Sequence, residues 1–232
     1  MSRSPIYLIP TVLSESGYHV IPGYVASIVK ECEVIFTENL RTTRRYIKQL
    51  NHNITIDDIE WFLLESSEST RKNFTDKVKE GKKIGVFSEA GCPGVADPGQ
   101  DLVAIAHSLE AEVIPLVGPS SILLALMASG MNGQQFCFHG YLPVKEPARG
   151  HTIRNLESLS AKNDSTQIFI ETPYRNNQLI DALCNTCRSE TQLCIAADLT
   201  AEGQWIKTKS IAEWKKVKPD LHKRPAIFLL KV

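Results

Sequence analysis

Residues 82–102, KKIGVFSEAGCPGVADPGQDL, constrain the fold of this chain more than any other stretch. A short apolar run enters a loop with three glycines and two prolines, and a helix-period segment follows. Glycine permits positive φ and close approach of a ligand, while proline stiffens a loop. Asp97 and Pro98 are a good helix start, because Asp caps free amides and Pro loses no hydrogen bond there. The stretch therefore predicts a strand, a shaped loop and a helix in direct succession.

In an open α/β sheet, ligands bind at the loops that follow the carboxyl ends of strands. The loop at 89–95 is thus a candidate binding loop, although a plain surface turn explains the same composition. It is not a familiar phosphate loop, because neither G-x-G-x-x-G nor G-x-x-x-x-G-K-[ST] occurs. A second turn follows at Gly118-Pro119. Ser120 and Ser121 after it are placed either to cap the next helix or to line the same cleft.

Apolar, β-branched runs alternate with helix-period segments along the first half of the chain. Strands are expected at 6–12, 33–38, 82–88 and 111–117, and helices at 23–32, 41–50 and 97–111. In the second half, strands are expected at 134–143, 166–174, 191–200 and 224–232, a helix at 122–130, and a strand leading into a helix at 204–217. This pattern predicts an α/β fold with two domains, 1–117 with a parallel sheet and 118–232 with a mixed sheet. The polar segment 143–151 is expected to be an exposed loop.

Charge and cysteine content exclude several classes of protein. Lys and Arg total 26 and Asp and Glu total 26, so no global field directs the chain to nucleic acid or membrane. The longest apolar run, 122–128, falls far short of the roughly 20 residues that span a bilayer. Without a signal-peptide pattern at the N-terminus, the six cysteines are expected to be free thiols in a reducing cytoplasm. Cys184-x-x-Cys187 favours a buried structural role over zinc or redox chemistry, and no metal site is predicted.

The segment 41–50 carries a cluster of positive charge. Arg41, Arg44, Arg45 and Lys48 recur at three- and four-residue spacing, which places them on one face of a helix. Such a face can neutralise several phosphates of a nucleic acid, or it can be an ordinary solvated surface.

Three glutamates each follow a strand-like run and are candidates for a general base: Glu38, Glu89 and Glu171. A carboxylate in such a place would face a cleft and could take a proton from a hydroxyl group. Glu38 and Glu89 are the predicted catalytic residues, with Glu38 first because the arginine-rich helix follows it directly. Glu38 and Glu171 also have a simpler explanation, in which they cap helices or pair with Arg41 and Arg175.

Five motifs occur in a fixed order: EVIFTENLRTTRRYIKQL, GVFSEAGCPGVADPG, VIPLVGPSSILLALMASG, FCFHGYLPVK and FIETPYR. Together they resemble the tetrapyrrole methylase superfamily and, within it, the ribosomal RNA small-subunit methyltransferase I family. Glu89 and Cys92 stand where that family has Asp and Thr. The resemblance covers most of residues 30–205. It implies two α/β domains with a cofactor cleft between them, the N-terminal domain on the substrate side and the C-terminal domain on the cofactor side.

The resemblance also implies roles for individual residues. It implies that the cofactor is S-adenosylmethionine, held by Ala90, Gly91, Cys92, Val95, Ser120, Ser121, Glu171 and Leu199. The predicted substrate contacts are Arg41, Arg44, Arg45, Lys48, Tyr174 and Arg175. The expected substrate is ribosomal RNA in the small ribosomal subunit, methylated on a ribose 2′-hydroxyl. The expected assembly is a cytoplasmic homodimer that involves no membrane and no metal.

Two features depart from the family's pattern. The loop after the first strand reads PTVLSESG, which keeps Pro10 but lacks an early glycine. The sequence also ends with RPAIFLLKV, before an expected C-terminal extension. Two alternatives therefore stay open. One is methylation of a tetrapyrrole or another small molecule, and the other is a non-catalytic relative that binds the cofactor or RNA.

Overall fold

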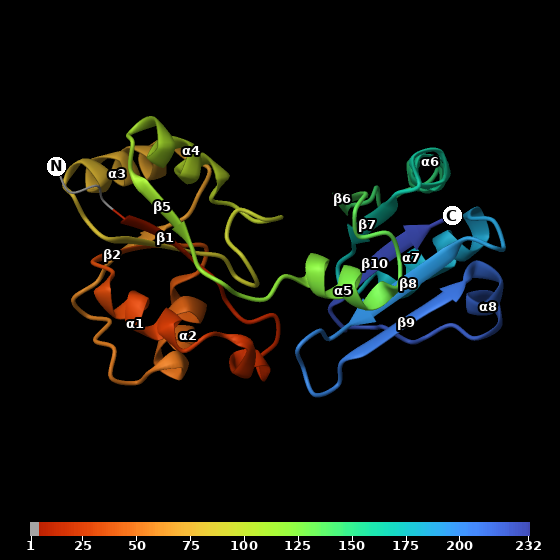
Figure 1. Ribbon diagram of the computed structural model, residues 1–232, viewed down its shortest axis with the longest axis horizontal. Helices are drawn as coiled ribbons and strands as arrows, with labels where there is room; N and C mark the ends of the chain where they lie inside the picture. Colours follow the sequence, from red (N-terminus) through yellow and green to blue (C-terminus); the bar gives the residue numbers. More distant parts are fainter. Residues whose placement is uncertain (1–4) are drawn as a thin grey trace. The chain divides into compact units, whose positions relative to one another are not determined.

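The structure is a computed structural model that describes residues 5–232. Its contacts divide the chain after Ser120 into an N-terminal unit and a C-terminal unit (Figure 1). The sequence predicts this division after residue 117. Each unit holds one five-stranded sheet covered by helices, so the predicted α/β fold is confirmed.

The N-terminal unit alternates strands with helices. Its elements are β1 (Pro5–Ile9), the 3₁₀ helix η1 (Gly17–Val20), α1 (Tyr24–Glu31), β2 (Val34–Thr37), α2 (Leu40–Leu50), β3 (Glu60–Leu63), α3 (Glu68–Lys79), β4 (Ile84–Phe87), α4 (Gln100–Ser108) and β5 (Glu112–Pro115). The strands are all parallel and lie in the order β3-β2-β4-β1-β5. Because parallel strands run the same way, their carboxyl ends meet at one edge of the sheet, called here the carboxyl edge.

Both faces of this sheet are covered. Every residue of β2 and β4 is buried, which explains why these strands read as continuous apolar runs without alternation. Helices α1 and α2 pack on the sheet through one set of buried side chains, Val25, Val29, Tyr46 and Ile47. Helices α3 and α4 contribute to a separate cluster through Phe74, Val78, Leu102 and Ala106. The sheet is thereby held between two helical layers that leave its carboxyl edge to the loops.

The C-terminal unit has a mixed sheet. Its elements are α5 (Ser121–Ser129), β6 (Phe136–Tyr141), α6 (Ala148–Asn163), β7 (Thr166–Ile170), α7 (Asn176–Thr186), β8 (Gln192–Ala197), β9 (Trp205–Ser210), α8 (Ile211–Lys216) and β10 (Ala226–Lys231). The strand order is β6-β7-β10-β8-β9, with β6 parallel to β7 and the other pairs antiparallel. The mixed sheet expected for the second half of the chain is present.

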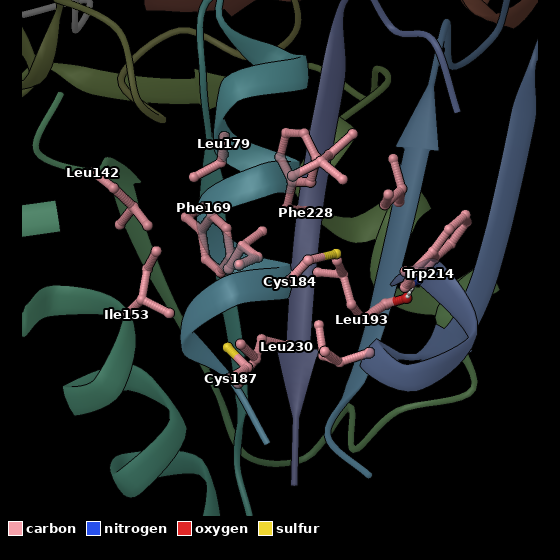
Figure 2. Packing of buried hydrophobic residues seen from close by; sticks show 14 of the residues in the cluster. Leu142, Ile153, Phe169, Leu179, Cys184, Cys187, Leu193, Trp214, Phe228 and Leu230 are labelled. Atoms are coloured by element: carbon pink, nitrogen blue, oxygen red, sulfur yellow. Dashed lines mark hydrogen bonds between the residues drawn. The ribbon is translucent and has the colours of Figure 1, made fainter. Parts of the chain in front are cut away.

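Cys184 of α7 and Cys187, the C-cap of that helix, belong to the core of the C-terminal unit. Figure 2 shows them among Leu193, Phe228 and Leu230. Burial raises the pKa of the Cys187 thiol to about 12, so this thiol is protonated at neutral pH and is a poor metal ligand or nucleophile. The structure supports the buried structural role expected for the Cys-x-x-Cys pair.

Two expectations about secondary structure were incomplete. β3 at residues 60–63 and α3 at residues 68–79 lie in a region where no element was predicted. The segment 143–151 is not all loop, because α6 begins at Ala148 and Arg149 is buried. The Arg149 guanidinium donates hydrogen bonds to the carbonyl oxygens of Pro143 and Val144, which compensates its burial. Along residues 5–232, no helix combines the length and apolar character that crossing a membrane requires.

The start of α4 corrects a prediction about Asp97. The helix begins at Gln100, and its N-cap is Gly99, which has φ +125° and no capping side chain. Only glycine adopts such a φ readily, so the cap position is decided by Gly99. Asp97 lies before this turn and does not cap the helix. Its carboxyl group is consequently available for another role.

Gly118 provides a test of how the loops pack. A Cβ atom at this position would lie 2.1 Å from the Pro10 Cβ, so any side chain forces the two loops apart. Gly118→Ala is expected to lower the free energy of unfolding by about 1–3 kcal/mol, measured by urea denaturation. Gly23→Ala is the matched control, since a Cβ there meets nothing within 4 Å. Equal stability of Gly118→Ala and wild type would contradict the described contact.

Candidate functional site

Three loops meet at the carboxyl edge of the N-terminal sheet. Thr11, after β1, pairs with Gly91, after β4: the Thr11 amide donates to the Gly91 carbonyl at 2.8 Å, and the Gly91 amide donates back at 3.3 Å. The Cys92 thiol donates to the carbonyl of Pro119, after β5, at 3.5 Å. The two glycine-proline turns predicted to line one site are therefore neighbours within the N-terminal unit.

The loop after β4 offers mostly backbone to a ligand. Ala90 and Val95 are exposed, Cys92 is half-buried, and Gly91 is buried at φ +79°. A side chain at Gly91 would press on neighbouring atoms at 3.3–3.4 Å, so glycine suits both the conformation and the space. Burial raises the pKa of the Cys92 thiol, which disfavours a role as nucleophile. Ser120 ends the N-terminal unit.

Glu38 and Glu89, the predicted catalytic residues, lie in contact. The Glu89 backbone amide donates to Glu38 Oε1 at 3.1 Å, and Thr42 Oγ1 donates to Glu89 Oε1 at 3.0 Å. Burial raises the pKa of the half-buried Glu38 carboxyl; the amide hydrogen bond opposes this effect, and the charge of Glu89 adds to it. A carboxylate with a raised pKa is suited to accept a proton near neutral pH.

Asp97 is a third carboxyl group at this edge. Burial raises its pKa to about 6, and the charges of Glu38 and Glu89 add to the effect. The sequence did not single it out for this role, because an Asp-Pro-Gly run also fits a helix cap. We call Glu38, Glu89 and Asp97 the acidic cluster. Among residues 5–232, no group of three or more His, Cys, Asp or Glu side chains is placed to hold a metal ion.

Helix α2 begins directly after Glu38. Its N-cap is Asn39, whose Oδ1 accepts hydrogen bonds from the amides of Arg41 and Thr42 at 3.0 and 3.4 Å. Glu38 therefore does not cap this helix, so capping does not explain the presence of a glutamate at this position. The cap also places Thr42 in the first turn, where its hydroxyl reaches Glu89.

The four predicted phosphate contacts of α2, called here the basic face, are all exposed: Arg41, Arg44, Arg45 and Lys48. The Arg44 guanidinium packs over the Trp61 ring, 5.0 Å from its centroid. Arg45 Nη1 lies 3.7 Å from Glu15 Oε1, and both side chains are strongly exposed. Exposed ion pairs of this kind are weak, so Arg45 can exchange its partner for a phosphate.

A pocket of about 240 Å³ opens between the loop after β1, α2 and the loop after β4. Arg45, Glu89 and Ala90 line it, and all three were predicted as site residues. Tyr18 and Gln49 also line it and were not predicted. The segment PTVLSESG, which departs from the family's pattern, supplies one wall. Loops at the carboxyl ends of parallel strands are where ligands bind, and this signal could have pointed to the residues of this loop from the sequence.

In the C-terminal unit, Glu171 follows β7 and Leu199 follows β8. Both strands run antiparallel to β10, so their carboxyl ends share one edge of that sheet. Buried Glu171 Oε1 accepts hydrogen bonds from Arg175 Nη2 at 2.7 Å and Nε at 3.0 Å. Burial alone would raise the pKa of Glu171, but the hydrogen bonds from Arg175 and Thr172 outweigh it and lower the pKa. Glu171 is thus a charged partner of Arg175, as the simpler explanation held, and a poor general base.

The other predicted residues of the C-terminal unit differ in exposure. Tyr174 is exposed and meets the His222 ring edge-on, with 5.9 Å between ring centroids. Leu199 is buried, and Ser121 is the half-buried first residue of α5. Tyr174 therefore has an accessible face, whereas a contact from Leu199 would use its backbone.

Comparisons with known proteins agree on one family. The family model described as Tetrapyrrole (Corrin/Porphyrin) Methylases matches residues 24–214. Ribosomal RNA small subunit methyltransferase I of Buchnera aphidicola subsp. Schizaphis graminum is 30% identical over 97% of this chain and 77% of its own length. The protein of the same name from Vibrio cholerae serotype O1 is 28% identical over 90% of this chain and 69% of its own length.

Two solved structures share the fold. The methyltransferase CobJ aligns with a TM-score of 0.64 and 15% identity, covering 100% of this chain and 94% of that one. Uroporphyrin-III-C-methyltransferase from Thermus thermophilus aligns with a TM-score of 0.57 and 15% identity, covering 99% and 92%. At this identity the likeness concerns the fold alone.

Asp97→Asn is expected to change how stability depends on pH. The pKa of Asp97 in the folded chain, about 6, lies above its ordinary 3.8, so the native state holds this proton more tightly than the unfolded chain does. The wild type therefore loses stability as the pH rises from about 4 to about 6, and Asn, which cannot ionise, does not share this loss. The free energy of unfolding of both proteins can be measured by urea denaturation at about pH 4 and about pH 7. Relative to wild type, Asp97→Asn should be more stable at the higher pH than at the lower pH. A difference that is the same at both pH values would contradict the raised pKa.

Proposed function

This chain belongs to the tetrapyrrole (corrin/porphyrin) methylase family and is a methyltransferase, and we propose that it methylates a ribose 2′-hydroxyl of small-subunit ribosomal RNA with S-adenosylmethionine. One observation carries the proposal. Glu38 accepts a hydrogen bond from Glu89, and Glu89 accepts one from Thr42 in the first turn of α2. A candidate base is thus joined to the helix that bears the basic face, a combination suited to an enzyme that modifies RNA.

S-adenosylmethionine fits the chemistry of the residues present. When bound, it supplies an electrophilic methyl group on a positively charged sulfur. Glu89 and Asp97 of the acidic cluster complement positive charge, and the exposed residues of the loop at 89–95 can meet the rest of the molecule. The proposed contacts are those the resemblance implied: Ala90, Gly91, Cys92, Val95, Ser120, Ser121, Glu171 and Leu199.

The chain's own residues have two tasks in such a reaction. They hold the acceptor oxygen in line for attack, an effect that can lower a barrier by roughly 7–11 kcal/mol. Glu38 takes the proton of the ribose hydroxyl, a contribution of typically about 10²–10⁴-fold in rate. Glu38 is preferred over Glu89 because burial raises its pKa, while Glu89 is exposed and accepts a hydrogen bond from Thr42.

The basic face would bind the phosphates that flank the target nucleotide, with Tyr174 and Arg175 as further proposed contacts. Small-molecule methylation is less favoured, because the relatives at 28–30% identity are named for ribosomal RNA. A non-catalytic relative is less favoured because both glutamates are present and in contact. The homodimer and the cytoplasmic location belong to the proposal on the resemblance alone.

The proposed reaction predicts incorporation of tritiated methyl groups from S-adenosylmethionine into small ribosomal subunits. Glu38→Gln should lower the single-turnover rate by about 10²–10⁴-fold while the Kd for S-adenosylmethionine, measured by calorimetry, stays near wild type. Glu33→Gln is the control, since Glu33 lies before the same strand and pairs with Lys82 at the opposite edge. No incorporation by folded wild-type protein that binds the donor would overturn the proposed function. A wild-type rate for Glu38→Gln would assign the base to another group.

Binding through the basic face predicts a salt-dependent loss. The double variant Arg41→Ala, Arg44→Ala should raise the KM for small ribosomal subunits by about tenfold or more and reduce the slope of log affinity against log salt by about 2. Lys72→Ala with Lys79→Ala removes the same charge from exposed positions of α3 and should leave both quantities unchanged. If the two double variants behave alike, the basic face does not bind RNA.

A further inference from the structure

The pocket beside Glu89 contains residues to which no role has been assigned. Its walls come from the loop after β1, η1, α2 and the loop after β4, all within the N-terminal unit. Glu89 belongs both to this pocket and to the acidic cluster. An occupant of the pocket would therefore lie next to the proposed base, Glu38.

The size and charge of the pocket restrict what can enter. Its volume of about 240 Å³ is below the roughly 300–1,000 Å³ of pockets that enclose drug-sized ligands. It is too small to enclose S-adenosylmethionine or a complete nucleotide, whereas a single planar ring system fits. Two carboxylates, Glu15 and Glu89, face one guanidinium, Arg45, and this excess of negative charge disfavours a phosphate. A neutral, flat occupant meets both conditions.

Tyr18 offers such an occupant a stacking surface. Its ring stacks on Tyr46, with 5.7 Å between centroids and 26° between planes. Tyr46 is itself held by a hydrogen bond from its hydroxyl to the Pro10 carbonyl at 2.7 Å. Tyr18 remains only half-buried and lines the pocket. A ring fixed in this way loses little freedom when another ring packs on it.

The pocket also contains a buried polar atom that lacks a partner. Within residues 5–232, the buried side-chain polar atoms without a hydrogen bond are Ser88 Oγ and Asn176 Oδ1, and Ser88 lines this pocket. Buried polar groups are nearly always satisfied, so the unpaired Ser88 Oγ beside the pocket is one more hydrogen-bonding group that an occupant could use. Gln49, which also lines the pocket, can both donate and accept hydrogen bonds.

We propose that this pocket binds one nucleobase, unstacked from the RNA substrate and laid against the Tyr18 ring. The inference rests on the proposed function and adds the site that selects the target nucleotide. Proteins commonly read single-stranded RNA by stacking its bases on aromatic side chains, and enzymes that act on a nucleotide take it out of the stack. With the base in the pocket, its ribose lies beside Glu89 and Glu38. The flanking phosphates extend toward Arg45 and the rest of the basic face.

Kinetics of two variants test the pocket. Tyr18→Leu removes the aromatic ring and should lower kcat/KM for small ribosomal subunits by about 10–100-fold, while the Kd for S-adenosylmethionine stays within about twofold. Tyr18→Phe keeps the ring and should recover most of the wild-type value. Gln49→Trp fills the pocket from an exposed helical position and should block methylation without lowering the melting temperature or the affinity for the donor. Methylation at the wild-type rate by Tyr18→Leu and Gln49→Trp overturns the proposal, and so does a selective loss of donor affinity.

Photochemical cross-linking gives a readout that is independent of methylation. The wild-type chain is irradiated with a single-stranded oligoribonucleotide that contains 5-iodouridine, and the attached peptide is identified by mass spectrometry. Attachment at Tyr18 supports binding of a nucleobase in the pocket. If attachment at Tyr18 occurs but small ribosomal subunits accept no methyl group, the proposed function fails and the pocket proposal stands. Attachment confined to other segments overturns the pocket while leaving the proposed function to its own test.

Discussion

The backbone pairing of Thr11 with Gly91 is the constraint on which the rest of the site depends. It ties the loop after β1 to the loop after β4, and the thiol of Cys92 extends the tie to the loop after β5. Each contact requires a residue without bulk: Gly91 for its positive φ, and Gly118 because Pro10 occupies the space of a side chain. With the loops held in this way, the acidic cluster and the pocket have fixed positions relative to the sheet.

The acidic cluster is unfavourable for stability and useful for chemistry. Three carboxyl groups close together repel one another when charged, and the partial burial of Glu38 and Asp97 removes water that would screen them. The structure accommodates this through single hydrogen bonds, from the Glu89 amide to Glu38 and from Thr42 to Glu89, and through a raised pKa at Asp97. The raised pKa of Glu38 and of Asp97 makes these two carboxyl groups better proton acceptors than ordinary carboxylates. Glu171, by contrast, is neutralised by Arg175 and is a poor proton acceptor.

The fold and the proposed substrate of this chain rest on different observations. CobJ and the Thermus thermophilus enzyme share the architecture at 15% identity, which leaves the substrate open because one fold hosts many activities. The proposed RNA substrate rests on relatives at 28–30% identity that are named for ribosomal RNA and on the chain's own surface, where the basic face continues from the acidic cluster along α2. The pocket with Tyr18 lies between them and gives a physical reason for an RNA substrate. The loop after β1 supplies part of that pocket, so a difference from the family's pattern in this loop changes the pocket wall.

The sequence by itself determined the features that are encoded locally. The buried strands β2 and β4, the helical spacing of the basic face and the placement of Glu38 and Glu89 after strands all follow from short-range patterns. β3 and α3 were not predicted from the sequence, because an edge strand that is not fully buried and a polar helix both lack a strong apolar pattern. Only the tertiary structure decided that β2 lies beside β4, which brings Glu38 to Glu89 across 51 positions of sequence. It also decided that Gly99 caps α4 in place of Asp97 and that Tyr18 borders a pocket. These outcomes depend on strand order and loop packing, and neither property is recorded in the periodicity of neighbouring residues.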